Sequence, residues 1–125
     1  MRQPLGFLEN RFRTKERHLM YRAMNRFAVS LENAAEFEAL WLGRDSHLKD
    51  MDGFVEFHML KGLEEDGKRL YASHTIWESE DMFIAWTKSQ QFRDAHSKAG
   101  TTRKLYDGTP RFEGFSTIQH LKYAG

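Results

Sequence analysis

The sequence predicts an α+β domain of ferredoxin-like βαββαβ order, in which two helices cover one face of an antiparallel sheet. Its 125 residues are 40% hydrophobic and 14% aromatic, which suits one domain with a substantial buried core. Alternating apolar residues mark four strands, whereas apolar residues three and four positions apart mark two helices. Their order along the chain is strand, helix, strand, strand, helix, strand.

Residues 1–19 differ from the rest of the chain, because they hold five Arg and Lys against two Glu and have poor helical periodicity. No apolar run follows, so the segment does not read as a secretory signal. We expect a flexible basic extension, with a nucleic-acid or membrane arm as the alternative. The folded domain is then residues 20–125.

Residues 21–30 predict the first strand, with one face formed by Tyr21, Ala23, Asn25, Phe27 and Val29. Asn25 thus lies in the middle of an apolar face. A buried amide needs hydrogen-bond partners, so either neighbouring backbone satisfies it or it is a donor directed into a pocket.

A helix follows from Asn33, which with Glu36 forms a capping-box pattern. Its apolar face runs from Phe37 through Trp41 to Leu48. Asp66–Gly67 predicts a tight hairpin between strands at 54–60 and 69–77. The region around 100–110 is rich in Gly and Thr and reads as a loop, which places the last strand at about 113–121.

The second helix is predicted over Ser79–Ser97, with Ser79 as its N-cap. Ser89 is a candidate second cap, which predicts a break or kink there. Trp86 and His96 lie roughly 15 Å apart along such a helix, about the span of a large flat ligand.

The uncovered face of the sheet predicts an interface. Alternation places Phe54 on one side of the second strand and Phe57 on the other, so both faces carry bulky apolar groups. Exposed apolar patches of this kind mark interaction sites. We expect a homodimer with its two sheets packed face to face.

Composition and motifs exclude several functions. There is no cysteine, so thiolate metal sites and thiol catalysis are absent. A net charge of +1 does not indicate nucleic-acid binding, and no apolar run is long enough to span a membrane. We therefore expect a cytoplasmic protein with neither nucleic acid nor membrane as a partner. No hydrolase, zincin or P-loop motif occurs.

Histidines are the remaining candidates for chemistry. His58 and His74 could form a cross-strand pair, for which a hydrogen-bonding role is favoured over a metal site because no acidic residue has ligand spacing beside them. His96 alone would be an ordinary helix-ending residue. With Phe92 one turn before it and no carboxylate nearby, it also resembles a proximal haem ligand.

Several segments together resemble the IsdG-type haem-degrading monooxygenases, dimeric ferredoxin-like α+β barrels of the antibiotic biosynthesis monooxygenase superfamily. The resemblance spans about Met20 to Leu121. Its segments are A-M-N-R-F, F-E-x-x-W-L-x-R-D-S-H-L, G-F-V-E-F-H-M-L, Y-A-S-H-T-I-W-E-S, F-I-A-W-T-K-S-x-x-F-R-D-A-H and F-E-G-F. The family's Asn, Trp and His triad matches Asn25, Trp86 and His96.

The resemblance implies haem as both cofactor and substrate, cleaved with O2 and external electrons to iron and a linear tetrapyrrole. His96 would be the axial ligand of the haem iron, Asn25 a hydrogen-bond donor at the open face, and Trp86 the ring that distorts the porphyrin. Phe27, Phe83 and Phe92 would line the site. A separate reductase or small reductant would supply electrons, because no flavin or nicotinamide motif is visible. Candidates for the haem propionates are Arg22, Arg26, Arg44 and Arg93. The alternatives are a cofactor-independent quinol or phenol monooxygenase and a non-enzymatic haem-binding protein.

Overall fold

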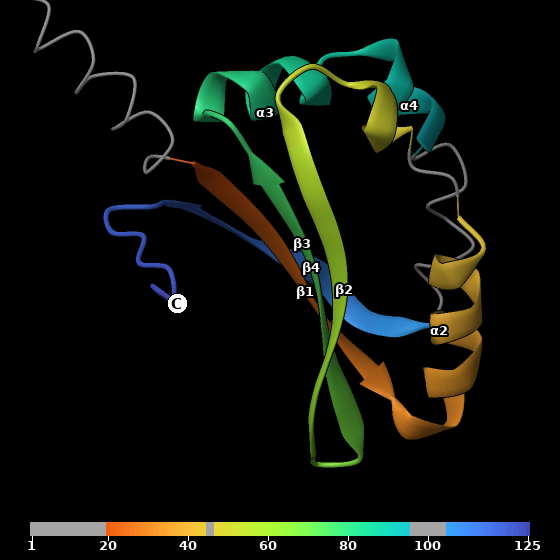
Figure 1. Ribbon diagram of the computed structural model, residues 1–125. Coiled ribbons are helices and arrows are strands. Elements are labelled where there is room, and N and C mark those ends of the chain that lie inside the picture. Colours follow the sequence, from red (N-terminus) through yellow and green to blue (C-terminus); the bar gives the residue numbers. More distant parts are fainter. Residues whose placement is uncertain (1–19, 45–46, 96–104) are drawn as a thin grey trace, which may run out of the picture.

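A computed structural model describes residues 20–44, 47–95 and 105–125 of the chain (Figure 1). The expected extension at residues 1–19 lies outside this range. The elements are β1 (Tyr21–Ser30), η1 (Leu31–Asn33), α2 (Ala34–Leu42), η2 (Leu48–Asp50), β2 (Phe54–Glu65), β3 (Lys68–Trp77), α3 (Glu80–Thr87), α4 (Gln90–Ala95) and β4 (Tyr106–Ser116).

The four strands form one antiparallel sheet in the order β2-β3-β1-β4. The helices α2, α3 and α4 lie on one side of this curved sheet, which we call its inner face (Figure 1). The predicted ferredoxin-like fold is therefore confirmed. Within the part of the chain that the structure describes, no helix is long and apolar enough to cross a membrane.

The first strand and the hairpin form where the sequence predicts them. β1 has the predicted bounds, and Asp66 and Gly67 have φ angles of 55° and 77°. Two successive positive φ angles are those of a type I′ turn, whose twist matches that of the flanking strands. β2 continues to Glu65, beyond the predicted residue 60.

The predicted position of the last strand was wrong, because β4 is Tyr106–Ser116 rather than 113–121. Gly108 and Pro110 made the early part of this strand look like a loop. Both suit their place: β4 is an edge strand, where a proline need not donate to a ladder. Gly108 has φ 64° beside the register shift between Arg26 and Ala28, as a bulge requires.

The first helix is shorter than its apolar periodicity suggests. Asn33 does precede α2, but its side chain makes no capping hydrogen bond, so the predicted capping box is not formed. The helix ends at Leu42 with Gly43 as its C-cap. Leu48 belongs to the separate short helix η2.

The predicted break in the second helical region is confirmed. The Ser79 hydroxyl accepts a hydrogen bond from the Met82 backbone N–H at 3.2 Å and begins α3. After Thr87 the helix stops, and the Ser89 hydroxyl accepts from the Phe92 N–H at 3.0 Å, which begins α4. Two serine caps therefore turn one periodic stretch into two helices.

The expectation that Phe54 and Phe57 lie on opposite faces was wrong. Phe54 pairs with Trp77 and Phe57 pairs with Thr75, so both side chains lie on the inner face. The register shifts between Phe54 and Glu56, which makes Val55 an extra residue in the strand. A bulge of this kind reverses the alternation, and it leaves no trace in the apolar pattern.

The outer face carries a polar cluster across three strands. Arg22 Nη1 lies 3.1 Å from His74 Nε2, and the rings of His74 and His58 are stacked with centroids 5.7 Å apart. His58 Nε2 also lies 2.9 Å from Glu56 Oε1. In the described ranges, no group of three or more His, Asp or Glu side chains could hold a metal ion.

His74 makes the stability of the fold depend on pH. Burial, and then the charges of Arg22 and His58, lower the pKa of His74 below its ordinary value of 6.5. Arginine can only donate, so Nε2 accepts and the ring is neutral. As pH falls below 6.5, the unfolded chain takes up a proton that the folded chain resists, so stability falls. We expect His74→Gln to flatten the difference between urea midpoints measured at pH 7.5 and 5.5. An unchanged difference would assign the acid sensitivity to another group.

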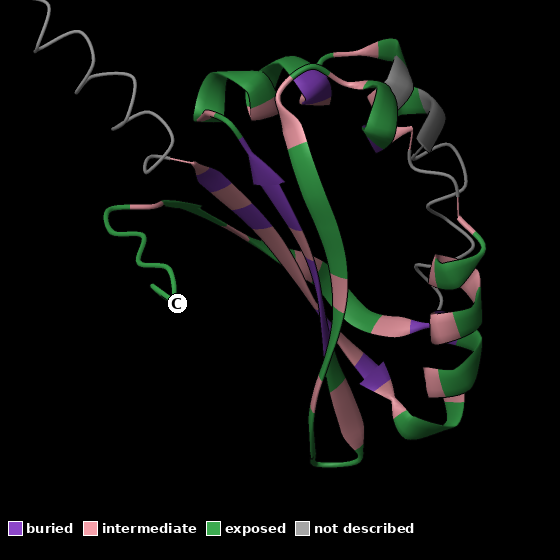
Figure 2. Ribbon diagram, in the orientation of Figure 1, coloured by how far each residue is buried: buried purple, intermediate pink, exposed green. Residues whose placement is uncertain are grey.

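Two apolar clusters fill the inner side of the sheet. The buried residues of the sheet itself lie on β1 and β3 (Figure 2). The upper cluster comprises the buried residues Tyr21, Ala23, Leu48, Trp77 and Trp86, with Met51, Phe54, Phe83 and Phe92 packed against it. The lower cluster comprises Phe27, Val29, Phe37, Tyr71 and Leu105, with Ala34, Leu40, Trp41, Met59 and Tyr106 against it.

Because Gly114 of β4 has no side chain, the buried ring of Tyr21 can lie directly over it. A Cβ atom added there would come within 1.8 Å of the Tyr21 hydroxyl and 2.7 Å of Cζ. We expect Gly114→Ala to lower the free energy of unfolding by about 1–3 kcal/mol, because the packed ring must move. Tyr21→Phe in the same chain should restore part of this loss, since the nearest atom is removed. Gly43→Ala is the control, because its Cβ would meet only Ala39 O at 3.6 Å. Equal urea midpoints for the two alanine variants would contradict the close approach.

Candidate functional site

Small side chains line the inner face between the two clusters. Ala23 of β1 pairs with Thr75 of β3 and Gly114 of β4, and Asn25 pairs with Ser73 of β3. Directly opposite residues of antiparallel strands point to the same face, so these five residues form a continuous floor. A floor of small residues between two groups of aromatic rings suits a flat apolar ligand.

Asn25 is the largest polar group of this floor. It is half-buried, and it stands between Ala23 of the upper cluster and Phe27 of the lower cluster. Within the described ranges, no hydrogen bond to its side-chain amide is seen. Phe112, its partner on β4, is 50% exposed. The amide is thus available to a ligand, as the second of the two sequence hypotheses requires.

Trp86 forms the upper wall with two further rings. Its indole is 7% exposed and lies 5.6 Å from the Trp77 ring and 4.7 Å, edge to face, from the Phe92 ring. The Ser89 hydroxyl donates to the Trp86 carbonyl at 2.6 Å, which fixes the end of α3 below this side chain. The break between α3 and α4 therefore brings Phe92 back onto Trp86.

Phe83 connects the upper wall to the edge of the sheet. Its ring stacks on Phe112 with centroids 5.8 Å apart and planes at 10°, and it lies 5.4 Å from Tyr21. Burial, and then the charge of Glu80, raise the pKa of Tyr21, so this phenol stays neutral. The upper wall is therefore uncharged and mainly aromatic.

The lower wall is built on α2. Phe27 packs 5.4 Å from Phe37 and 5.9 Å from Trp41, and Trp41 stacks on Phe57 at 6.2 Å. The indole N–H of Trp41 is buried and has no acceptor among the described residues. Arg44 lies 4.3 Å above the Trp41 ring. An aromatic wall with an unsatisfied donor and a cation beside it could hold a ligand that combines a flat ring with polar groups.

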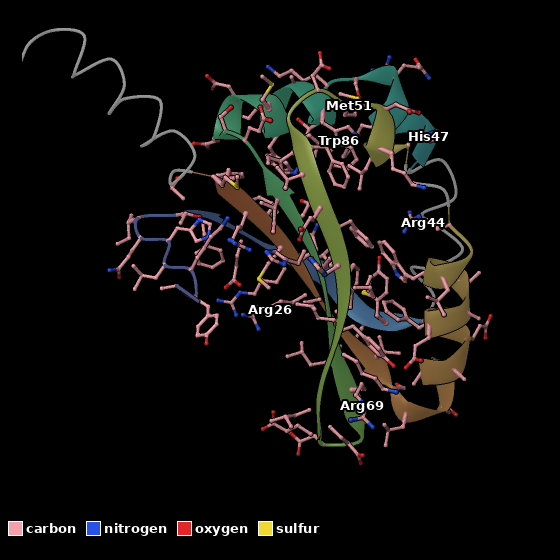
Figure 3. The ribbon with its side chains drawn as sticks, viewed as in Figure 1. Arg26, Arg44, His47, Met51, Arg69 and Trp86 are labelled. Carbon is pink, nitrogen blue, oxygen red and sulfur yellow. The ribbon has the colours of Figure 1, made fainter. Side chains whose placement is uncertain are left out.

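The four arginines that are candidates for binding the propionates do not all lie on the same face of the sheet. Arg22 and Arg26 lie on the outer face, where they contact His74 and, at 2.8 Å, Glu113. Arg93 is exposed and donates to Gln90 at 2.7 Å. Arg44 lies at the top of α2, on the side of the sheet that carries Trp86, whereas Arg26 lies on the other side (Figure 3).

Burial lowers the pKa of Arg44, against an opposing effect of Tyr106. Arginine nevertheless remains a cation at neutral pH. Arg44 is thus the one described arginine of the four that suits an anionic group at this site.

The structure brings together most of the predicted site residues, though not in one group. Phe83 and Phe92 each pack against Trp86, whereas Phe27 belongs to the opposite wall, with Asn25 between. His96 lies outside the described residues.

Sequence reasoning did not find Trp41, Phe57 and Phe112 as parts of the site. Arg44 was only one of four candidates, although its spacing of three from Trp41 on a helix was a signal for their contact.

Comparisons with known proteins agree with this fold. The antibiotic biosynthesis monooxygenase family model matches residues 20–98. The chain is 32% identical over 92 residues to the staphylobilin-producing haem oxygenase of Staphylococcus saprophyticus, covering 73% of this chain and 85% of that protein.

Among solved structures, a mutant of SnoaB, a cofactor-independent oxygenase from Streptomyces nogalater, is 25% identical with a TM-score of 0.61, over 83% of this chain and 98% of that one. A MhuD mutant with two manganese protoporphyrin IX molecules per active site is 19% identical with a TM-score of 0.66, over 82% and 99% of the two chains, and shows the shared fold. The family match covers more than half of the sequence, and the fold agrees with it. The chain belongs to the antibiotic biosynthesis monooxygenase family.

Proposed function

We propose that this protein is a haem-degrading monooxygenase of the IsdG type, which binds haem as cofactor and substrate. The observation that carries the proposal is its 32% identity to a haem oxygenase, over 85% of that protein. The reaction would consume O2 and electrons from an external donor and release iron, a linear tetrapyrrole and a one-carbon fragment.

The residues of the inner face fit a haem. A porphyrin is flat and largely apolar, as are the floor around Ala23 and Gly114 and the walls that contain Trp86 and Trp41. Its carboxylates require cations and donors, which Arg44 and the buried Trp41 N–H supply on this side of the sheet. Bound haem would supply the iron that activates dioxygen and the ring that is oxidised.

Each residue of the proposed triad has a separate task. His96 would hold the iron as an axial ligand, a role that rests on the family resemblance. Asn25 would donate a hydrogen bond to the bound ligand from the floor between the two walls. Trp86, held by Trp77 and Phe92, would supply a rigid aromatic contact against the porphyrin. Phe27, Phe83 and Phe92 would complete the apolar lining.

The protein would act as a homodimer in the cytoplasm, where reductants are available. Leu60 and Leu70 of the outer face are 39% and 38% exposed, and Phe115 is 48% exposed. Ile118 and Leu121, beyond β4, are 90% and 82% exposed. A second copy packed on this face would cover them. The electron donor would be a separate reductase or a small reductant.

A cofactor-independent oxygenase is the second candidate, because the chain is 25% identical to SnoaB over nearly all of that protein. The same floor could then hold a flat phenolic substrate, with Asn25 as the hydrogen-bond donor. A cofactor-independent oxygenase of this kind would not use a histidine as a metal ligand.

Titration with haemin separates the two candidates. A haem-degrading monooxygenase should show a saturable Soret band of a histidine-ligated complex at one haemin per chain. A cofactor-independent oxygenase should show only the spectrum of free haemin. Myoglobin and a haem-free protein such as lysozyme calibrate the two spectra. Absence of a bound spectrum at micromolar protein would reject haem as the substrate.

A further inference from the structure

His47 holds an unfavourable backbone conformation. It lies between α2 and η2 with φ 61° and ψ 14°, in the left-handed region. Asp66 is the other non-glycine residue of the described chain with a positive φ, and there the hairpin turn requires it. Side chains with a Cβ are disfavoured in this region by contact with the backbone. Glycine would relieve that contact at position 47.

Helix capping does not explain why a histidine is at this position. His47 is the N-cap of η2, yet its side chain makes no capping hydrogen bond. It is half-buried rather than fully solvated. Strained non-glycine residues persist where the surrounding structure or a function maintains them.

The chain crosses from one wall of the site to the other at His47. Before it, α2 contributes Phe37 and Trp41 to the lower cluster. After it, Leu48, which is 3% exposed, and Met51 pack in the upper cluster with Trp86. His47 therefore lies in the connection between the two clusters that flank Asn25. Figure 3 places it on the helix side of the sheet, above Arg44.

The two nitrogen-bearing side chains of this connection suit a carboxylate. Arg44 brings a half-buried guanidinium whose Cζ lies 4.3 Å from the centre of the Trp41 ring, three positions before His47. A guanidinium and an imidazole N–H can donate together to one carboxylate, and such charge-assisted bonds are stronger than neutral ones. A propionate-bearing porphyrin on the floor would need such groups at its edge.

We propose that His47 donates a hydrogen bond to a propionate carboxylate of the bound porphyrin, beside Arg44. The proposal rests on haem binding at this site and adds a residue that recognises the polar edge of the ring. It gives a function to a histidine that holds a left-handed backbone conformation.

The test compares two metal-free ligands, so that iron ligation plays no part. Protoporphyrin IX carries both carboxylates and its dimethyl ester carries none. Binding of each is measured by tryptophan fluorescence quenching, in the same detergent, to the wild type, His47→Gly, His47→Asn and Asp66→Gly. The Asp66 variant is the matched control, because it relieves a positive φ of 55° at the hairpin turn instead.

We expect His47→Gly to bind protoporphyrin IX about tenfold more weakly, with no change for the dimethyl ester, since a hydrogen bond to a charged group is lost. Its melting temperature should not fall. His47→Asn, which keeps an N–H donor, should lie between the two, and Asp66→Gly should bind both ligands like the wild type.

If His47→Gly weakens the binding of both ligands equally, His47 contacts the ring and not a carboxylate, and the proposal is overturned. No weakening for either would also overturn it. If the wild type binds neither porphyrin, the haem-binding function fails as well, and that outcome is recognised from the wild type alone.

Discussion

His96→Ala should abolish the histidine-ligated haem spectrum while the protein remains folded. His96 is the proposed axial ligand, and a single iron–nitrogen bond determines the band positions of the complex. The floor and walls between Asn25 and Trp86 are unchanged in this variant, so a porphyrin can still enter. We expect metal-free protoporphyrin IX to bind with nearly wild-type affinity, whereas haemin loses both its ligated spectrum and its turnover.

Two control variants make this result specific. His74→Ala removes a histidine from the outer face, where its ring is stacked on His58, and should leave the haemin spectrum unchanged. External imidazole should restore a ligated spectrum to His96→Ala if the lost group is the ligand. A normal spectrum in His96→Ala, with loss in the His74 or His58 variant, would move the ligand to the outer face and reject the inner-face site.

Asn25→Ala should bind haemin nearly normally and degrade it at least about tenfold more slowly. A hydrogen bond to a charged or polarised oxygen contributes roughly 1.5–3 kcal/mol, which corresponds to about ten- to over a hundredfold in rate. On the proposed function, apolar burial between the two walls would supply most of the affinity without the amide. The measurement is a single-turnover decay of the Soret band with excess reductant in air, together with the haemin dissociation constant.

Asn33→Ala is the matched control, because it removes an asparagine whose side chain makes no capping hydrogen bond. It should leave both quantities unchanged. If affinity and rate fall together in Asn25→Ala, this residue is a wall of the site rather than a hydrogen-bond donor in the reaction.

The sequence predicted elements whose signals are local. β1 alternates cleanly, Asp66–Gly67 has the chemistry of a type I′ turn, and Ser79 and Ser89 supply their own capping oxygens. In each case, a few adjacent residues determine the backbone.

The missed features depend on partners far away in the chain. β4 includes Pro110 because that strand lies at the edge of the sheet, which no local pattern reveals. The bulge at Val55 turned Phe57 to the inner face, and it reflects pairing with β3. The prediction that both faces of β2 carry aromatic rings failed for this reason, and so did the placement of Phe57 outside the site.

The candidate site was predicted in part. Asn25 and Trp86 were found from one strand and one helix, and the structure places them at the floor and upper wall of one face. The lower wall with Trp41 and Arg44 could not be assigned, since it depends on how α2 crosses the sheet. Roles for Asn25, Trp86 and His96 came from the family resemblance and stay predictions.

Aerobic turnover tests the central claim most directly. Haemin bound to the wild-type protein is mixed with excess ascorbate, once in air with catalase and once under argon, and the Soret band is followed beside free iron trapped by a ferrous chelator. The account predicts that the band disappears in air, with about one iron released per haem, and persists under argon. A stable Soret band in air, with no iron released, would show a haem-binding protein that does not degrade its ligand.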